Sequence, residues 1–125
     1  MNKITILDAN AILRYILYDI PEQAHATKEI LINGEVLILP EVIAEVIYVM
    51  NKTYKIPRET VAKSVSRFLK NAIYTDDILI NAVENFGIMN LSFIDCILLE
   101  YSKHYEVFTF DEKLIKTIKK WGQND

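Results

Sequence analysis

Short apolar runs and longer stretches of helical periodicity alternate along the chain. Residues 3–7, 36–39 and 106–110 are short and rich in β-branched or aromatic side chains, which predicts strands. A short extended piece at residues 73–74 is a candidate edge strand. The remaining apolar positions have the spacing of amphipathic helices. These helices are expected over residues 10–18, 21–31, 40–52, 58–71, 75–87, 92–104 and 112–121.

Prolines and glycines mark several ends of these helices. Pro21 and Pro40 suit the first turn of a helix, where the N–H that proline lacks would have no helical partner. Gly34 stands where a C′ glycine belongs, and Gly87 is expected to end the helix that begins near residue 75. The expected helix boundaries therefore rest mainly on prolines, which restrict the backbone, and on glycines, which allow it more conformations.

Strands that alternate with helices indicate βα units. The expected fold class is therefore α/β, with a central, mostly parallel sheet of about four strands and helices on both faces. No repeat or linker divides the chain, so residues 1–125 are expected to form a single domain. In such sheets the functional site lies at the carboxyl ends of the strands.

Composition narrows the class of protein further. The chain has 51% hydrophobic and 25% charged residues, which is typical of a globular domain with a core. The single cysteine, Cys96, cannot form an internal disulfide, and no Cys/His cluster suggests zinc. The apolar N-terminal run is interrupted by Asp8, Asn10 and Arg14, which argues against a signal peptide. We therefore expect a cytoplasmic protein without a membrane span.

Two of the expected strands end directly in an acid. Asp8 follows residues 3–7, and Asp111 follows residues 106–110. Either acid could serve only as an Asx turn or a helix cap. Asn10 is the better cap candidate for the first helix, which leaves Asp8 free to face the carboxyl edge of the sheet. The shared position at that edge favours a functional role for both acids.

Two further acids lie on helices. Glu45 is in a helix that is apolar on most sides and shares a face with Val42 and Val49. A carboxylate there loses hydration and needs a partner or a metal, unless it lies partly exposed at the edge of the apolar stripe. Asp95 follows Ser92 by three residues, as the acid of a capping box does. That capping role is compatible with a role as a ligand.

The four acids together predict a metal site. Clustered carboxylates repel one another, so they need hard cations if they are to stay ionised. Oxygen ligands suit Mg²⁺ or Mn²⁺, which neutralise phosphates and activate water. The pattern therefore predicts hydrolysis of a phosphodiester. The candidate catalytic and metal-binding residues are Asp8, Glu45, Asp95 and Asp111.

Other chemistries have little support in the sequence. The chain has no GxGxxG or GxxxxGK[ST] loop for a nucleotide and no GxSxG elbow of a serine hydrolase. His25 and His104 lie in largely polar helical contexts, so we expect surface residues rather than catalytic bases. Cys96 is expected to be a small core residue rather than a nucleophile.

Four segments of the chain resemble the PIN-domain family, in the order and spacing that the family has. The resemblance is strongest to the VapC-like ribonuclease toxins of bacterial and archaeal toxin–antitoxin systems, and it covers nearly the whole chain. The segments are LDANAILRYIL, PEVIAEVIYVM, LSFIDCILLEYS and VFTFDEKL.

The resemblance implies an endoribonuclease that depends on Mg²⁺ or Mn²⁺, is usually a homodimer and is inhibited by a cognate antitoxin protein. Asn10 and Thr109 match polar residues that accompany the first and the last acid in the family. Ser92 is a further supporting residue, and it stands where many relatives have another acid. This departure bears on how firmly a second metal is held. The acids that match the family's acidic residues are Asp8, Glu45, Asp95 and Asp111.

The net charge of −3 is unusual for a protein that binds nucleic acid without sequence preference. Binding of RNA therefore has to rest on local charge and on metal. A solvated helix surface explains most of the lysines and arginines, although a few could contact phosphates. Arg14 is a candidate for contacting the substrate or the acidic tail of a partner. The other basic residues considered are Lys52, Lys55, Arg58, Lys63, Arg67, Lys70, Lys113, Lys116, Lys119 and Lys120.

Two alternatives to the toxin remain open. One is a non-catalytic PIN-like module for dimerisation and partner capture, which the retention of all four acids disfavours. The other is a PIN nuclease of RNA maturation that has no antitoxin. A predicted apolar groove for an antitoxin helix is formed by Ile12, Tyr15, Ile16 and Tyr48, unless these residues belong to the core.

Overall fold

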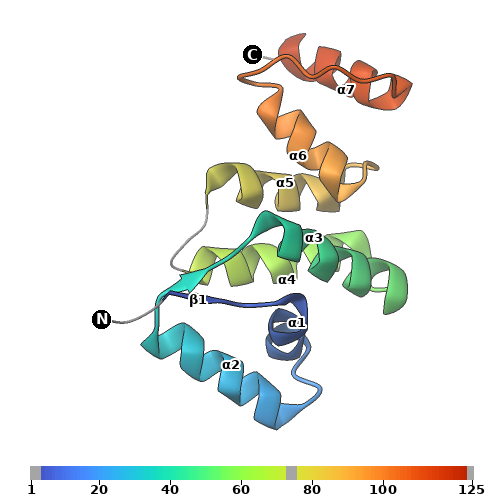
Figure 1. The fold of residues 1–125 in the computed structure, drawn as a ribbon. Helices are drawn as coiled ribbons and strands as arrows, with labels where there is room; N and C mark the ends of the chain where they lie inside the picture. Colours follow the sequence, from blue (N-terminus) through green and yellow to red (C-terminus); the bar gives the residue numbers. More distant parts are fainter. Residues whose placement is uncertain (1–3, 73–75, 124–125) are drawn as a thin grey trace.

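A computed structural model describes residues 4–72 and 76–123 (Figure 1). Helices dominate, and the expected helices are found with small shifts at their ends. The elements in chain order are β1 (Thr5–Ile6), α1 (Ala9–Leu17), α2 (Pro21–Asn33), β2 (Val36–Leu37), α3 (Pro40–Tyr48), the π-helical segment η1 (Val49–Thr53), α4 (Arg58–Asn71), α5 (Asp77–Ile88), α6 (Phe93–Tyr101) and α7 (Glu112–Gln123).

The sheet within the described residues has two parallel strands, β1 and β2, which are joined through α1 and α2. Thr5 lies opposite Val36, and Ile6 lies opposite Leu37. This end of the chain confirms the predicted βα connection. Leu7, just beyond β1, is buried, whereas the side chain of Ile6 is 55% exposed. The helices therefore cover one face of β1 and leave the other open, which differs from the expected cover on both faces.

The predicted strand at residues 106–110 is wrong for this arrangement. These residues have no regular secondary structure, and their aromatic side chains Phe108 and Phe110 are 88% and 86% exposed. The segment leads into α7, which lies at the end of the molecule opposite α1 and α2 (Figure 1), so neither of the strands found among residues 4–72 and 76–123 lies beside it to complete a ladder. The predicted edge strand at 73–74 falls outside the described residues.

A continuous apolar core joins the sheet to the helices. It runs from Leu7 and Val36 through Ile43 and Val65 to Leu99. Tyr15 on α1 packs against Phe68 on α4, with ring centroids 5.9 Å apart. None of the helices in the described part of the chain has the length and apolar character of a membrane span.

Both glycines that were expected to end helices differ from the prediction. Gly34 does end α2, but its φ of −131° is extended rather than left-handed. Helix α5 continues through Gly87 to Ile88. A Cβ atom on Gly87 would lie only 2.6 Å from the Cβ of Ala62 on α4. Gly87 is therefore required by the close approach of α4 and α5, not by the end of a helix.

Arg58, the first residue of α4, joins this helix to the turn between α5 and α6. Its Nε donates to the carbonyl of Phe86 at 3.1 Å, and Nη2 donates to the carbonyl of Met89 at 2.9 Å and also to that of Leu91. The guanidinium carbon lies 3.7 Å from the centroid of the Phe86 ring. Burial lowers the pKa of Arg58 from its ordinary value. Arg58 thus stabilises the C-terminal end of α5 and holds α4 against it.

Replacing Gly87 by alanine should lower the free energy of unfolding by about 1–3 kcal/mol, because the added methyl group has no room between α4 and α5 and such overpacking destabilises a protein. The higher helix propensity of alanine is too small to offset the clash with Ala62. Urea denaturation of Gly87→Ala measures the change. The double variant Gly87→Ala/Ala62→Gly is the matched control and should recover part of the loss. A single variant as stable as the original protein would contradict this packing.

Candidate acidic site and basic cleft

Asp8 caps the first helix. It ends the extended segment after β1 with φ −83° and ψ 173°, and its Oδ1 accepts a hydrogen bond from the backbone N–H of Ala11 at 2.8 Å. The expectation that Asn10 would be the cap is wrong, because α1 already begins at Ala9 and Asn10 lies inside it with an exposed side chain. Asp8 remains exposed at the carboxyl end of β1 while it caps the helix. Capping therefore does not remove its carboxylate from the surface.

Asp111 has the same local role at the start of α7. Its Oδ1 accepts a hydrogen bond from the N–H of Leu114 at 2.9 Å. The N–H of Asp111 donates to the hydroxyl of Thr109 at 3.0 Å, so Thr109 orients the residue from two positions upstream. Asp111 is exposed. The contact between Thr109 and the last acid is thus present, although the acid does not follow a strand.

The two helix acids differ from each other in burial. Glu45 on α3 is exposed, so its carboxylate keeps its hydration and the expectation of apolar surroundings is wrong. Asp95 is half-buried in the first turn of α6. The backbone N–H of Asp95 donates to the hydroxyl of Ser92 at 3.1 Å, which confirms Ser92 as the cap of this helix.

The chain brings these acids together only in part. Helix α3, which carries Glu45, contacts both α1 and α6, whereas α7, which Asp111 caps, contacts α6 and lies at the far end from α1 (Figure 1). Within residues 4–72 and 76–123, no three Asp, Glu, His or Cys side chains are placed so that they could hold a metal ion. The four acids therefore stay predicted ligands of Mg²⁺ or Mn²⁺.

Arg14 is held within its own chain. Its guanidinium donates to the carboxylate of Asp19, and their side chains are 14% and 43% exposed. The hydrogen bonds with Tyr54 and then with Asp19 raise the pKa of Arg14 from its ordinary value. Binding of a phosphate or of an acidic tail by Arg14 would have to compete with Asp19, so its predicted role in binding substrate stays a prediction.

The predicted apolar groove is largely core. Ile12 is completely buried, and Tyr15 packs against Phe68. Ile16 is half-buried against the same core, and Tyr48 alone of this set is well exposed. The period of α1 was correctly recognised, but the face that includes Ile12 packs inward on α3 and α4. These residues do not form an open groove for a partner.

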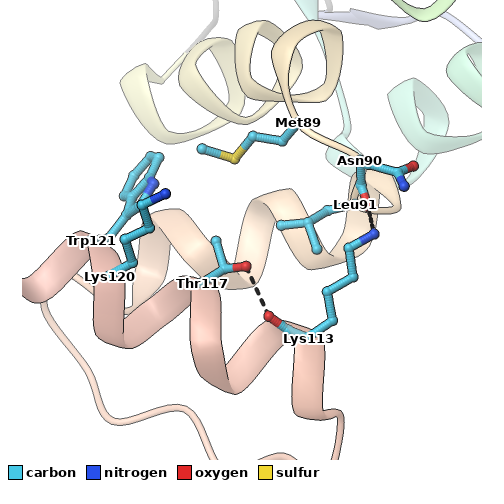
Figure 2. Close-up of a pocket in the computed structure, with 7 residues that line it drawn as sticks. All are labelled: Met89, Asn90, Leu91, Lys113, Thr117, Lys120 and Trp121. Atoms are coloured by element: carbon cyan, nitrogen blue, oxygen red, sulfur yellow. Dashed lines mark hydrogen bonds between the residues drawn. The ribbon is translucent and has the colours of Figure 1, made fainter.

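A cleft of about 290 Å³ lies between α7 and the turn from α5 to α6 (Figure 2). Leu91 and Met89 form its apolar wall, and Met89 extends across the cleft towards Trp121 (Figure 2). The ammonium of Lys113 donates to the carbonyl of Asn90, which holds α7 against this turn. We name this feature the basic cleft, and the remaining residues that line it are Thr117 and Lys120.

Two lysines of α7, Lys113 and Lys120, line the basic cleft, and the helix carries further lysines outside it. Within α7, Lys113, Lys116, Lys119 and Lys120 are accompanied by a single acid, Glu112, in a chain whose net charge is −3. Local positive charge of this kind attracts phosphate even in an acidic protein. Trp121 adds an aromatic surface on which an unpaired base could stack. The cleft thus combines the two features that single-stranded nucleic acids need from a binding surface.

Glu100 is a buried acid that the sequence pattern did not single out. Its side chain is 3% exposed, accepts a hydrogen bond from Asn85 at 3.0 Å and pairs with Lys103 at 3.2 Å. The ammonium of Lys103 also lies 5.0 Å from the centroid of the Trp121 ring. Glu100 is therefore a satisfied structural acid, and through Lys103 it links α6 to Trp121 on α7.

Cys96 and the histidines have the surroundings that the sequence predicted. His25 and His104 are exposed. Cys96 is buried, and burial raises the pKa of its thiol to about 11. Since the thiolate is the reactive form, this environment makes Cys96 a poor nucleophile.

At pH 8, native Cys96 should react with a thiol reagent such as DTNB at least about 100-fold more slowly than the unfolded protein, since an ordinary thiol has a pKa near 8.5. The rate is followed by absorbance in buffer and in guanidinium chloride. A cysteine introduced at the exposed position of Tyr105 (Tyr105→Cys) provides the control for a reactive thiol. Equal rates for native and unfolded Cys96 would show that the core around it opens readily.

The fold defines the class of protein to which the chain belongs. Two parallel strands joined through helices, with Asp8 at the carboxyl end of β1, are features of an α/β domain. The sequence profile of the PIN domain family matches residues 5–120, and the chain belongs to this family. PIN domains are typically nucleases that use divalent metal ions. No curated protein and no solved structure matches the chain.

Proposed function

We propose that this protein is an endoribonuclease that depends on Mg²⁺ or Mn²⁺, and that it is the toxin of a type II toxin–antitoxin pair. The observation that supports nuclease activity is membership of the PIN-domain family over residues 5–120. The four segments that contain the predicted acids have the same order as in VapC-like toxins, which supports the toxin over other PIN-domain nucleases. Asp8, Glu45, Asp95 and Asp111 are the proposed catalytic acids and metal ligands, and three of them are exposed.

The basic cleft is the proposed contact surface for RNA. Its lysines supply charge for phosphates, and Trp121 supplies a stacking surface beside Met89 (Figure 2). A cognate antitoxin would bind elsewhere than at the predicted groove, because Ile12 is buried. A gene for a small DNA-binding antitoxin beside this one would favour the toxin over a nuclease of RNA maturation.

Asp8→Asn should lower cleavage of RNA by about 100-fold or more while leaving the fold intact. The loss is expected because ligands and their supporting groups control metal-dependent activity. Asparagine is as good an N-cap as aspartate, so the hydrogen bond from Ala11 can be kept. The measurement is cleavage of a mixed tRNA and mRNA pool with Mn²⁺, with Mg²⁺ and with EDTA.

Asp77→Asn is the matched control for this experiment. Asp77 is also an exposed acid in the first turn of a helix, but it is not among the proposed ligands. Cleavage by Asp8→Asn at the rate of Asp77→Asn would contradict the assignment. A non-catalytic binding module would show neither cleavage nor a rise in melting temperature with Mn²⁺ that Asp8→Asn removes.

Single-stranded RNA should quench the fluorescence of Trp121, the only tryptophan of the chain, in a titration with EDTA present. Lys120→Gln should weaken this binding several-fold and reduce its salt dependence, because one phosphate contact is lost. Lys63→Gln on α4 is the control and should bind as the original protein does. Quenching that Lys120→Gln leaves unchanged would place the RNA elsewhere, without bearing on metal-dependent cleavage.

A further inference from the structure

A second cleft, of about 310 Å³, lies between α1, α2 and α4. We name it the α1–α4 cleft. It is separate from the basic cleft, because α7 lies at the other end of the molecule from α1 and α2 (Figure 1). It also differs from the apolar groove that the sequence predicted, since neither Ile12 nor Tyr48 lines it. Asp8 caps the N-terminal end of α1, whereas the cleft begins at Tyr15, near the C-terminal end of that helix.

Two cations from different helices line the α1–α4 cleft. Lys28 is on α2 and Arg67 is on α4, and both are exposed. Among residues 4–72 and 76–123, neither side chain forms an ion pair or a hydrogen bond. By contrast, Lys63 and Lys70, on either side of Arg67 along α4, have a carboxylate at 4.0 Å and 3.4 Å. No Asp or Glu of the described chain lines the cleft, so its two positive charges are available to an anion.

The rest of the lining is apolar and aromatic, with two neutral polar groups. Tyr15, Ile16 and Phe68 supply the apolar surface, and the rings of Tyr15 and Phe68 have centroids 5.9 Å apart. Ser64 adds a hydroxyl and Asn71 adds an amide, both of which donate and accept hydrogen bonds. This combination suits a ligand in which a planar ring with polar edges is joined to an anionic group.

Tyr18, which also lines the cleft, has a backbone conformation that tyrosine rarely adopts. It ends α1 with φ 56° and ψ 32°, in the left-handed region where glycine and asparagine are the usual residues. Core packing does not explain the choice of tyrosine, because the side chain is 51% exposed and lies outside the hydrophobic core. A ligand that contacts the ring in the cleft gives a reason for a tyrosine at a position where it strains the backbone.

We propose that the α1–α4 cleft binds a nucleoside monophosphate, either as a free nucleotide or as the 5′-terminal nucleotide of an RNA. A phosphate monoester carries a charge of about −1.5 to −2 at pH 7, which matches the two cations Lys28 and Arg67. Arginine can bind phosphate through two parallel hydrogen bonds. The base stacks on the exposed ring of Tyr18, and Ser64 and Asn71 bind polar atoms of the sugar or base.

Size and charge together favour this class of ligand. The volume of about 310 Å³ is at the lower end of the range of about 300–1,000 Å³ for small-molecule sites, which suits one nucleotide rather than several. Inorganic phosphate would leave the ring of Tyr18 without a partner, and a nucleoside would leave both cations without one. The site uses none of the four predicted metal ligands, so it stands apart from the proposed nuclease activity.

Calorimetric titration of the full chain tests the proposal, with EDTA present so that no divalent metal takes part. The probes are AMP, GMP, CMP and UMP, each compared with its nucleoside and with inorganic phosphate. At least one nucleotide should bind with a Kd below about 1 mM, and about tenfold or more tightly than its nucleoside or phosphate. Added salt should weaken this binding, because it screens the two exposed cations. Phosphate that binds as tightly as every nucleotide would overturn the proposal.

A short single-stranded RNA with a 5′-phosphate, compared with the same RNA with a 5′-hydroxyl, distinguishes the two sources of the nucleotide. Tighter binding of the phosphorylated RNA indicates an RNA terminus as the ligand. Binding of the free nucleotides alone indicates a small molecule. If no nucleotide binds below about 1 mM and the 5′-phosphate makes no difference to the RNA, the proposal is wrong.

Arg67→Gln should weaken binding of the nucleotide or of the phosphorylated RNA about tenfold or more, since a charge-assisted contact with phosphate is lost. The melting temperature should change little, because Arg67 is exposed and unpaired. Lys63→Gln is the matched control: Lys63 lies one turn away on the same helix and does not line the cleft. An equal effect of the two variants on binding would contradict the site.

Tyr18→Asn separates contact with a ligand from a role in the fold. Asparagine tolerates the left-handed conformation better than tyrosine does, so the melting temperature should stay the same or rise. Binding of the nucleotide should still weaken several-fold, because the stacking surface is lost. A role of Tyr18 in stability alone predicts the reverse, a lower melting temperature with unchanged binding, and that result would overturn the assignment of Tyr18.

Discussion

The position of the C-terminal third of the molecule depends on the guanidinium of Arg58. It satisfies three carbonyls at the end of α5 and in the turn that follows, and it stacks on Phe86. Carbonyls at the end of a helix have no partner within that helix, so a cation placed there is stabilising. The turn that Arg58 holds is also the wall of the basic cleft, through Met89 and Leu91. The direction in which α6 leaves α5, and hence the place of α7, follows from this contact and from the close packing at Gly87.

The proposed catalytic acids also shape the backbone. Asp8 and Asp111 each accept a hydrogen bond from the first turn of the helix they cap, and Ser92 does the same for the helix that carries Asp95. One carboxylate can therefore define where a helix begins and still offer an oxygen to solvent. A role as a cap and a role as a ligand are for this reason not exclusive at Asp8 or Asp111.

The sequence predicted local structure better than it predicted contacts. Helical periodicity placed seven helices close to their observed positions, because amphipathic spacing is a property of the segment itself. The strand at 106–110 failed because alternation shows only that a segment can join a sheet, not that a partner lies beside it. The burial expected for Glu45 and the exposure expected for Ile12 failed for a similar reason, since both depend on which helix packs against which face. Glu100 was missed because its partners Asn85 and Lys103 approach it only in the folded chain.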